Sequence, residues 1–178
     1  MMSSKKEMLL NVAEKLFYLH GFHAIGLKRI ITDAEIAIMT LYNHFESKDA
    51  LIVQVLLRRE QRYLEQLRQY ADNQSKPLFL NLAEGHARWL MEYENRGCLF
   101  LRAKEEFGAD ANHVIVQIVN AHKKHVMTLI KKLNPSVSNR DLLQFILLLE
   151  GSTALAETED VNEVCRELIH MTEKSFKS

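Results

Sequence analysis

The sequence has few of the residues that interrupt helices, with only 6 glycines and 2 prolines among 178 residues. Runs that alternate apolar and polar residues are also scarce, whereas apolar residues recur every three or four positions, the period of an amphipathic helix. Turn residues that occur only at long intervals indicate long helices joined by short connections. The sequence therefore predicts an all-α fold of about nine helices.

Three further absences restrict the class of protein. Cys98 and Cys165 are the two cysteines, and they form no Cys-x-x-Cys pair, which argues against a zinc knuckle or a disulfide framework. The longest apolar run, residues 145–149, is far shorter than the roughly 20 residues of a membrane span. The N-terminus shows no apolar segment typical of a signal peptide. We expect a cytoplasmic protein that has no membrane partner, no cofactor and no metal.

An excess of charge of either sign is also missing. The chain has 23 basic and 23 acidic residues, and a formal net charge of zero. Nucleic-acid binders usually carry a basic excess, although hydroxyl, amide and helix-end donors also contact phosphate. Residues 1–50 are balanced too, with Lys5, Lys6, Lys15, Lys28, Arg29 and Lys48 against Glu7, Glu14, Asp33, Glu35, Glu46 and Asp49.

Polar side chains are instead concentrated in one short segment, MTLYNHFESKDAL, at residues 39–51. Residues 27–44 fit two short helices joined by a tight turn at residues 34–36, the arrangement of a helix-turn-helix. Leu41 and Phe45 are expected to hold the second helix on the core, which leaves its other side chains facing outward. We expect phosphate contacts from Thr40, Tyr42, His44 and Lys48, and base contacts from Ile38 and Met39, with Asn43, Lys28 and Arg29 nearby.

The stretches Gly21-Phe-His-Ala, Thr40-Leu-Tyr-Asn-His-Phe and Ser47-Lys-Asp-Ala-Leu resemble the DNA-binding domain of TetR-type (TetR/AcrR) transcriptional regulators. The resemblance implies a three-helix DNA-binding domain at residues 1–50, a connecting helix from about residue 48, and a ligand-binding and dimerisation domain at residues 51–178. It also implies a homodimer that binds a palindromic double-stranded DNA operator. Repression would be relieved by a small-molecule effector.

Three residues depart from the pattern of this family. Glu35 stands where a glycine is usual, so we expect a left-handed backbone there at a cost of about 1 kcal/mol. Ala37 stands where a Ser N-cap is usual, and Ile38 where a polar or basic residue is frequent. Base reading is therefore expected to use apolar contact with thymine methyl groups. A family member that has lost DNA binding remains an alternative.

Two helices near the C-terminus are expected to form a dimer interface. The helix over residues 142–156 carries apolar residues around nearly its whole circumference, which requires burial on all sides. A second copy of the chain would provide that burial; the alternative is that earlier helices wrap this helix completely. The predicted interface residues are Leu142, Phe145, Leu149, Val161, Cys165 and Leu168.

Ligand sites in helical proteins form between helices and are mostly apolar with a few polar groups. The candidate ligand-binding residues are Trp89, Tyr93, Phe100, Arg102, Phe107, Gln117, His122 and Phe145. A buried Arg102 would need an anionic partner, which is Glu105, Glu106 or a ligand carboxylate. His122 and His125 have the spacing of a metal pair, but no third ligand follows at a fitting distance. An all-α ligand-binding protein or metal-dependent enzyme without DNA binding is the alternative function, and no catalytic residue is predicted.

Overall fold

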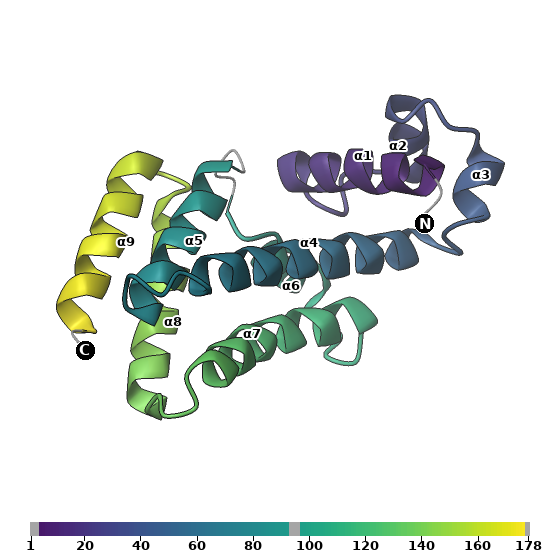
Figure 1. The fold of residues 1–178 in the computed structure, drawn as a ribbon. Helices are drawn as coiled ribbons and strands as arrows, with labels where there is room; N and C mark the ends of the chain where they lie inside the picture. The colour runs from purple at the N-terminus through teal and green to yellow at the C-terminus, as the bar shows by residue number, and fades with distance from the viewer. Residues whose placement is uncertain (1–3, 93–96, 177–178) are drawn as a thin grey trace. The chain divides into compact units, whose positions relative to one another are not determined.

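The computed structural model describes residues 4–92 and 97–176, and these residues form nine helices and no strand (Figure 1). The all-α prediction is confirmed. None of the described helices is both long enough and apolar enough to cross a membrane. The helices are α1 (Ser4–His20), α2 (Leu27–Asp33), α3 (Ile38–Tyr42), α4 (Lys48–Ala71), α5 (Leu78–Glu92), α6 (Leu99–Phe107), α7 (Val114–Leu133), α8 (Asn139–Leu155) and α9 (Val161–Ser175).

The chain divides into two compact units. Unit 1 comprises Met1–Arg59 and Leu99–Ala121, and unit 2 comprises Glu60–Cys98 and His122–Ser178. The helices α4 and α7 each supply residues to both units. The predicted domain boundary near residue 50 stays a prediction.

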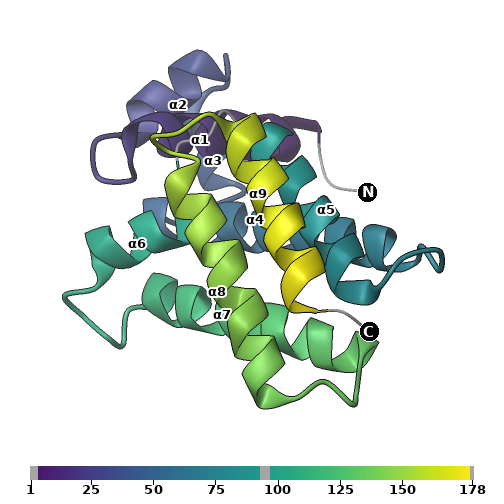
Figure 2. The ribbon, with the colours of Figure 1, turned by 90° about the vertical axis from the view of Figure 1, so that its left-hand side faces the viewer.

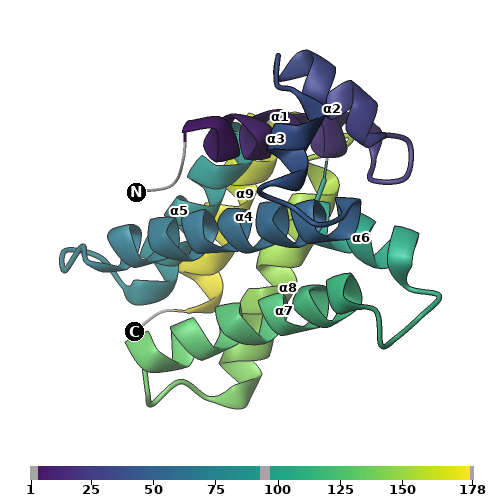
Figure 3. The same ribbon diagram turned by 90° about the vertical axis from the view of Figure 1, so that its right-hand side faces the viewer.

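In unit 1, α1 packs on α2 and α3, which also pack on each other (Figure 3). The buried face of α1 carries Leu9, Ala13 and Phe17 at the spacing of an amphipathic helix. The helix ends at Gly21, whose φ of 85° is the left-handed conformation that glycine adopts without strain. The core of this unit is therefore built on one face of α1.

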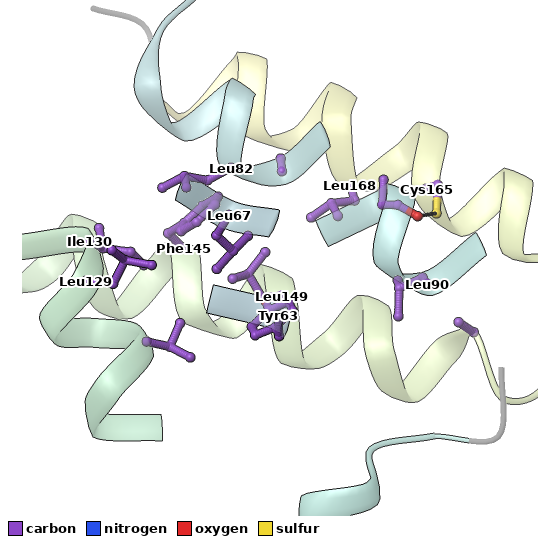
Figure 4. Packing of buried hydrophobic residues seen from close by; sticks show 14 of the residues in the cluster. Tyr63, Leu67, Leu82, Leu90, Leu129, Ile130, Phe145, Leu149, Cys165 and Leu168 are labelled. Carbon is purple, nitrogen blue, oxygen red and sulfur yellow. Dashed lines mark hydrogen bonds between the residues drawn. The ribbon is translucent and has the colours of Figure 1, made fainter. Parts of the chain in front are cut away.

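In unit 2, α5, α8 and α9 pack on one another, and α8 lies beside α9 (Figure 2). The ring of Phe145 is fully buried, and its centroid lies 4.8 Å from that of Phe79 and 5.8 Å from that of Phe176. Figure 4 shows Leu82, Leu149 and Leu168 in the same hydrophobic cluster. Large apolar side chains from three helices thus share one core.

The helices α8 and α9 each begin with a side-chain cap. The Ser138 hydroxyl accepts a hydrogen bond of 3.0 Å from the Asp141 amide. The Asp160 carboxylate accepts bonds of 2.7 and 3.3 Å from the amides of Asn162 and Glu163. Each cap satisfies amides that have no partner inside the helix.

The predicted dimer-interface residues need a correction in their placement. Five of them are buried in the core of this single chain, namely Leu142, Phe145, Leu149, Cys165 and Leu168, and Val161 is half-buried. Their side chains therefore already have partners within unit 2. The large apolar residues of α8 that stay exposed are Leu143, Leu147 and Leu155, at 55%, 63% and 55%. Earlier helices therefore do not wrap α8 completely. The uniform apolar character of this helix hid which of its faces points inward.

A chain of hydrogen bonds crosses the core of unit 2. His86 is buried; its Nδ1 lies 2.8 Å from the Tyr63 hydroxyl, and its Nε2 lies 3.2 Å from the Thr153 hydroxyl. The Thr153 hydroxyl donates in turn to the Leu149 carbonyl at 2.9 Å. Burial lowers the pKa of His86 from 6.5 to about 4, while its hydrogen bonding to the Leu149 backbone opposes that shift. Neutral His86 completes the chain if Tyr63 donates to Nδ1 and the Nε2 hydrogen points to Thr153.

The burial of neutral His86 predicts a loss of stability in acid. Between pH 6.5 and about 4 the unfolded chain binds a proton at this imidazole and the folded chain does not. The free energy of unfolding should therefore fall by about 3 kcal/mol across this range because of His86 alone. In chemical denaturation at several pH values, His86→Leu should be less stable at pH 7 but should show a flatter pH dependence. An equal slope in this variant and in the exposed-site control His170→Gln would contradict the assignment.

Candidate nucleic-acid interface

The turn between α2 and α3 has the geometry of a Schellman motif. The amide of Ile36 donates to the Ile31 carbonyl at 3.0 Å, and the amide of Glu35 donates to the Thr32 carbonyl at 3.2 Å. This pattern places Glu35 at the position that favours glycine. Its φ of 53° confirms the left-handed conformation predicted from the sequence. Glutamate there costs about 1 kcal/mol relative to a residue without a Cβ.

Packing rather than capping holds α3 in place. Ala37 stands at the N-cap of α3 and makes no side-chain cap bond. Leu41 is fully buried and Phe45 almost so, which confirms their predicted role as anchors. The next helix does have a side-chain cap, since the Ser47 hydroxyl accepts a bond of 3.0 Å from the Ala50 amide. The ends of α3 are thus fixed by the core below and by the start of α4.

The predicted DNA-contacting residues lie within unit 1, on α2, on α3, in the turn that follows α3 and at the start of α4. The exposed fractions of Ile38, Met39 and Tyr42 are 42%, 68% and 49%. The exposed members of the remaining set are Lys28, Arg29 and Asn43, and the half-buried ones are Thr40, His44 and Lys48. None of the nine is buried in the core. Their contact with DNA remains a prediction.

Two of the basic groups in this set, Arg29 and Lys48, have acidic residues close to them. Arg29 Nε lies 2.8 Å from Asp33 Oδ2 one helical turn away. An exposed pair of this kind contributes less than about 1 kcal/mol, so a phosphate can compete for Arg29. Burial lowers the pKa of Lys48 from its ordinary value, while the charges of Glu106 and Asp49 oppose that shift.

Several acidic groups of the first fifty residues have cationic partners in the fold. Arg58 lies 2.9 Å from Glu7 and 3.1 Å from Glu14, and Arg59 lies 2.9 Å from Glu14. These pairs offset part of the acidic charge that the sequence places near the expected DNA-reading helices. The balanced net charge is therefore a weaker objection to phosphate contact than it is in the sequence alone.

The end of α1 is held by two residues of α6, which we call the α6 clasp, namely Arg102 and Glu106. Arg102 Nη1 donates to the Tyr18 carbonyl at 2.6 Å and to the Phe17 carbonyl at 3.4 Å. The Glu106 carboxylate accepts from the amides of Phe22 at 2.8 Å and His23 at 2.5 Å. The Arg102 guanidinium thus binds the carbonyl end of the α1 dipole, and the Glu106 carboxylate binds the amides that follow this helix.

The α6 clasp changes the interpretation of Arg102. The sequence suggested an acidic neighbour or a ligand carboxylate as the partner of a buried Arg102. The structure shows bonds from Arg102 to backbone carbonyls at the end of α1, a kind of partner that the sequence did not suggest. The role of Glu106 was not predicted from the sequence. A positive-φ glycine followed by amides without helical partners is the signal that an acceptor is needed there.

The eight predicted ligand-binding residues are not brought together within one unit. Phe100, Arg102, Phe107 and Gln117 belong to unit 1, and Trp89, His122 and Phe145 belong to unit 2. Tyr93 lies outside the described residues. In unit 1, the Phe107 ring contacts the Phe22 ring, and the side-chain amide of Gln117 donates to the Asn112 carbonyl at 3.2 Å. Unit 2 places Trp89 next to Tyr63, with ring centroids 5.2 Å apart.

The two histidines with metal-ligand spacing converge on a carboxylate. The Nδ1 atoms of His122 and His125 both lie 3.0 Å from Glu60 Oε1. Burial raises the pKa of Glu60, but the hydrogen bonds from the two histidines outweigh this effect and leave its pKa below the ordinary value. Among the described residues, no group of three or more His, Cys, Asp or Glu residues is suited to hold a metal ion.

Two short helices joined by a tight turn, with the second one exposing its side chains, define the class of helix-turn-helix proteins. Residues 9–55 match the family model described as bacterial regulatory proteins, tetR family. Over 61 residues the chain is 39% identical to the HTH-type transcriptional regulator UidR of Escherichia coli strain K12. That match covers 34% of this chain and 31% of the length of UidR.

The similarity of the fold extends over nearly the whole chain. SCO4454, a TetR-family transcriptional regulator from Streptomyces coelicolor, superposes with a TM-score of 0.84 at 27% identity, covering 97% of this chain and 88% of that one. A TetR transcriptional regulator from Legionella pneumophila gives a TM-score of 0.83 at 23% identity and covers 99% of both chains, which supports the fold. Residues 9–55 thus match the TetR family of bacterial regulatory proteins, and the fold of nearly the whole chain is similar to that of TetR-family regulators.

The α6 clasp predicts that Glu106→Gln loosens the end of α1. A neutral amide keeps one acceptor but loses the charge that strengthens the bonds from the amides of Phe22 and His23. We expect hydrogen exchange at these two amides to speed up, and the free energy of unfolding to fall by about 1–2 kcal/mol. The neighbouring exposed Glu105→Gln serves as the matched control. Equal exchange rates in the two variants would show that the clasp does not stabilise this turn.

Proposed function

We propose that this chain is a sequence-specific DNA-binding transcriptional regulator that acts as a repressor. The observation that carries the proposal is the exposed face of α3, which carries Ile38, Met39 and Tyr42 while Leu41 anchors the helix below. In a helix-turn-helix, such a face enters the major groove. The family match over residues 9–55 supports the same function. A cytoplasmic location follows from this proposal, because the operator DNA of a bacterium lies there.

Phosphate contacts are assigned to Tyr42 on this face and to the groups that flank it. Thr40 and Tyr42 carry hydroxyl groups and His44 an imidazole, and Lys48 adds a charge at the start of the 24-residue helix α4. The positive end of that helix dipole also attracts phosphate. Lys28 and Arg29 on α2 extend the basic edge. These groups position the protein on the duplex, whereas base contacts select the sequence.

The proposed regulator responds to a small-molecule effector bound by its C-terminal helices. Trp89 is half-buried and packs edge-on against Tyr63, close to the buried His86. Apolar rings beside a few polar groups are the surroundings in which small ligands bind. Because Trp89 is the only tryptophan in the sequence, its fluorescence offers a direct assay for effectors.

A homodimer is part of the same proposal, with α8 as the interface. Leu143, Leu147 and Ala154 are exposed and share one side of α8 with Gly151. A Cβ added at Gly151 would meet nothing within 4 Å in this chain, so the glycine leaves room for another backbone. Exposed apolar side chains at helical spacing fit a two-fold interface in which α8 meets its copy.

The alternative is an all-α ligand-binding protein or metal-dependent enzyme without DNA binding. It is not favoured, because the family match falls on the helix-turn-helix segment itself. In addition, the histidine pair that suggested a metal is hydrogen-bonded to Glu60.

Selection from a random double-stranded oligonucleotide library tests the proposed function. The purified chain should enrich a palindrome whose half-sites are about one helical turn apart, as expected for a two-fold symmetric reader. The conservative variant Tyr42→Phe should bind that palindrome about tenfold more weakly, since one phosphate bond per protomer is lost. Failure to enrich any palindrome would refute sequence-specific DNA binding.

Replacement of an exposed apolar residue on α8 tests the dimer. Leu147→Glu places a charge in the proposed interface, where an unpaired charge is strongly unfavourable. We expect this variant to be monomeric by analytical ultracentrifugation at micromolar concentration and to lose its affinity for a palindromic operator. Met91→Glu, at an exposed apolar site on α5, should remain dimeric. A dimeric Leu147→Glu protein would place the interface elsewhere.

A further inference from the structure

The first turn of α3 presents apolar side chains to solvent that the fold does not need there. Ile38 and Met39 are 42% and 68% exposed, and the core position of this short helix is filled by the fully buried Leu41. Exposed apolar surface is unfavourable by roughly 25 cal/mol per Å². Folding of the chain therefore does not explain why two large apolar residues stand at the beginning of this helix.

The two residues lie on the face of α3 that points away from the core. At 100° per residue, Ile38, Met39 and Tyr42 fall within an arc of about 100°, and Leu41 lies outside that arc. The helix hydrogen bonds continue to Asn43, whose amide donates to the Met39 carbonyl at 3.0 Å. Asn43 is exposed and stands at the end of the same turn. The exposed face of α3 thus carries two apolar side chains, Ile38 and Met39, and one amide side chain, Asn43, at the end of the helix.

Neither Ile38 nor Met39 has a side-chain donor that could bond a base edge. They therefore cannot provide the bidentate contacts to guanine that arginine or lysine make. Thymine is the base that presents an apolar group, its 5-methyl, in the major groove, while adenine is the base that asparagine recognises with two hydrogen bonds. The chemistry of Ile38, Met39 and Asn43 therefore matches T·A pairs.

We infer that Ile38 and Met39 select the operator by apolar contact with thymine 5-methyl groups, with Asn43 reading an adjacent adenine. The inference rests on the proposed function and adds the chemical class of the DNA sequence that the site takes. Removal of one buried methyl weakens binding about fourfold, and removal of one methyl in each half-site weakens it about fifteenfold.

The test replaces thymine by uracil, which deletes the methyl and keeps every hydrogen-bonding group. Each thymine of the selected palindrome is changed to uracil symmetrically in both half-sites, and Kd is measured by fluorescence anisotropy at fixed salt. We expect one or two positions at which the substitution weakens binding about fifteenfold. Changing that T·A pair to a pair between 5-methylcytosine and guanine should preserve more affinity than the unmethylated C·G pair.

Side-chain variants connect the effect to this face of α3. Met39→Ala and Ile38→Ala should bind the thymine operator more weakly than the wild type, and one of them should no longer distinguish thymine from uracil. Met91→Ala, at an exposed methionine on α5, should retain the full discrimination. Both α3 residues are exposed, so the variants are expected to fold, which circular dichroism verifies.

The possible outcomes separate this inference from the function on which it rests. The inference and the proposed function are both supported if a palindrome has one or two positions at which uracil weakens binding, and if the α3 variants lose this sensitivity to uracil. A palindrome that binds equally well with uracil at every thymine overturns the inference and leaves the proposed function intact. Uracil sensitivity that persists unchanged in both α3 variants also overturns it. If no palindrome is enriched, the inference and the proposed function fail together.

Discussion

The hold of α6 on the end of α1 is the interaction on which the geometry of unit 1 depends. The last carbonyls of α1 and the amides after Gly21 have no partners within the helix. Arg102 and Glu106, one turn apart on α6, supply a cation for the carbonyls and an anion for the amides. Because α2 and α3 pack on α1, the clasp fixes the support on which the proposed DNA-reading helix stands. For a regulator that responds to an effector, a displacement of α6 would break these same bonds.

Local chemistry made much of the fold predictable. The left-handed Glu35 depends on a few neighbouring residues, and it was found as expected. The same holds for Leu41 and Phe45, whose spacing identified the buried side of α3. For the proposed interface, the sequence could supply the candidate residues, because all of them lie within the short segment 28–48, and their contact with DNA stays a prediction.

Contacts between distant residues were not predictable in this way. The partners of the α6 clasp are 84 positions apart in the sequence, and Glu60 meets His122 across 62 positions. No periodicity encodes such pairs. The faces of α8 were missed for a different reason: apolar residues surround the helix, so its pattern does not distinguish the buried Leu142 from the exposed Leu143.

The balanced charge of the first fifty residues has a consequence for how the proposed regulator would find its operator. Affinity for arbitrary DNA comes almost entirely from phosphate neutralisation, and here Glu35 and Glu46 remain exposed near the reading helix. Residence of the proposed regulator on unrelated DNA would therefore be short, and a larger share of its molecules would be free in solution at any moment. Such a protein would search by frequent dissociation and re-encounter rather than by long sliding, and its occupancy of the operator would depend on base contacts more than on salt.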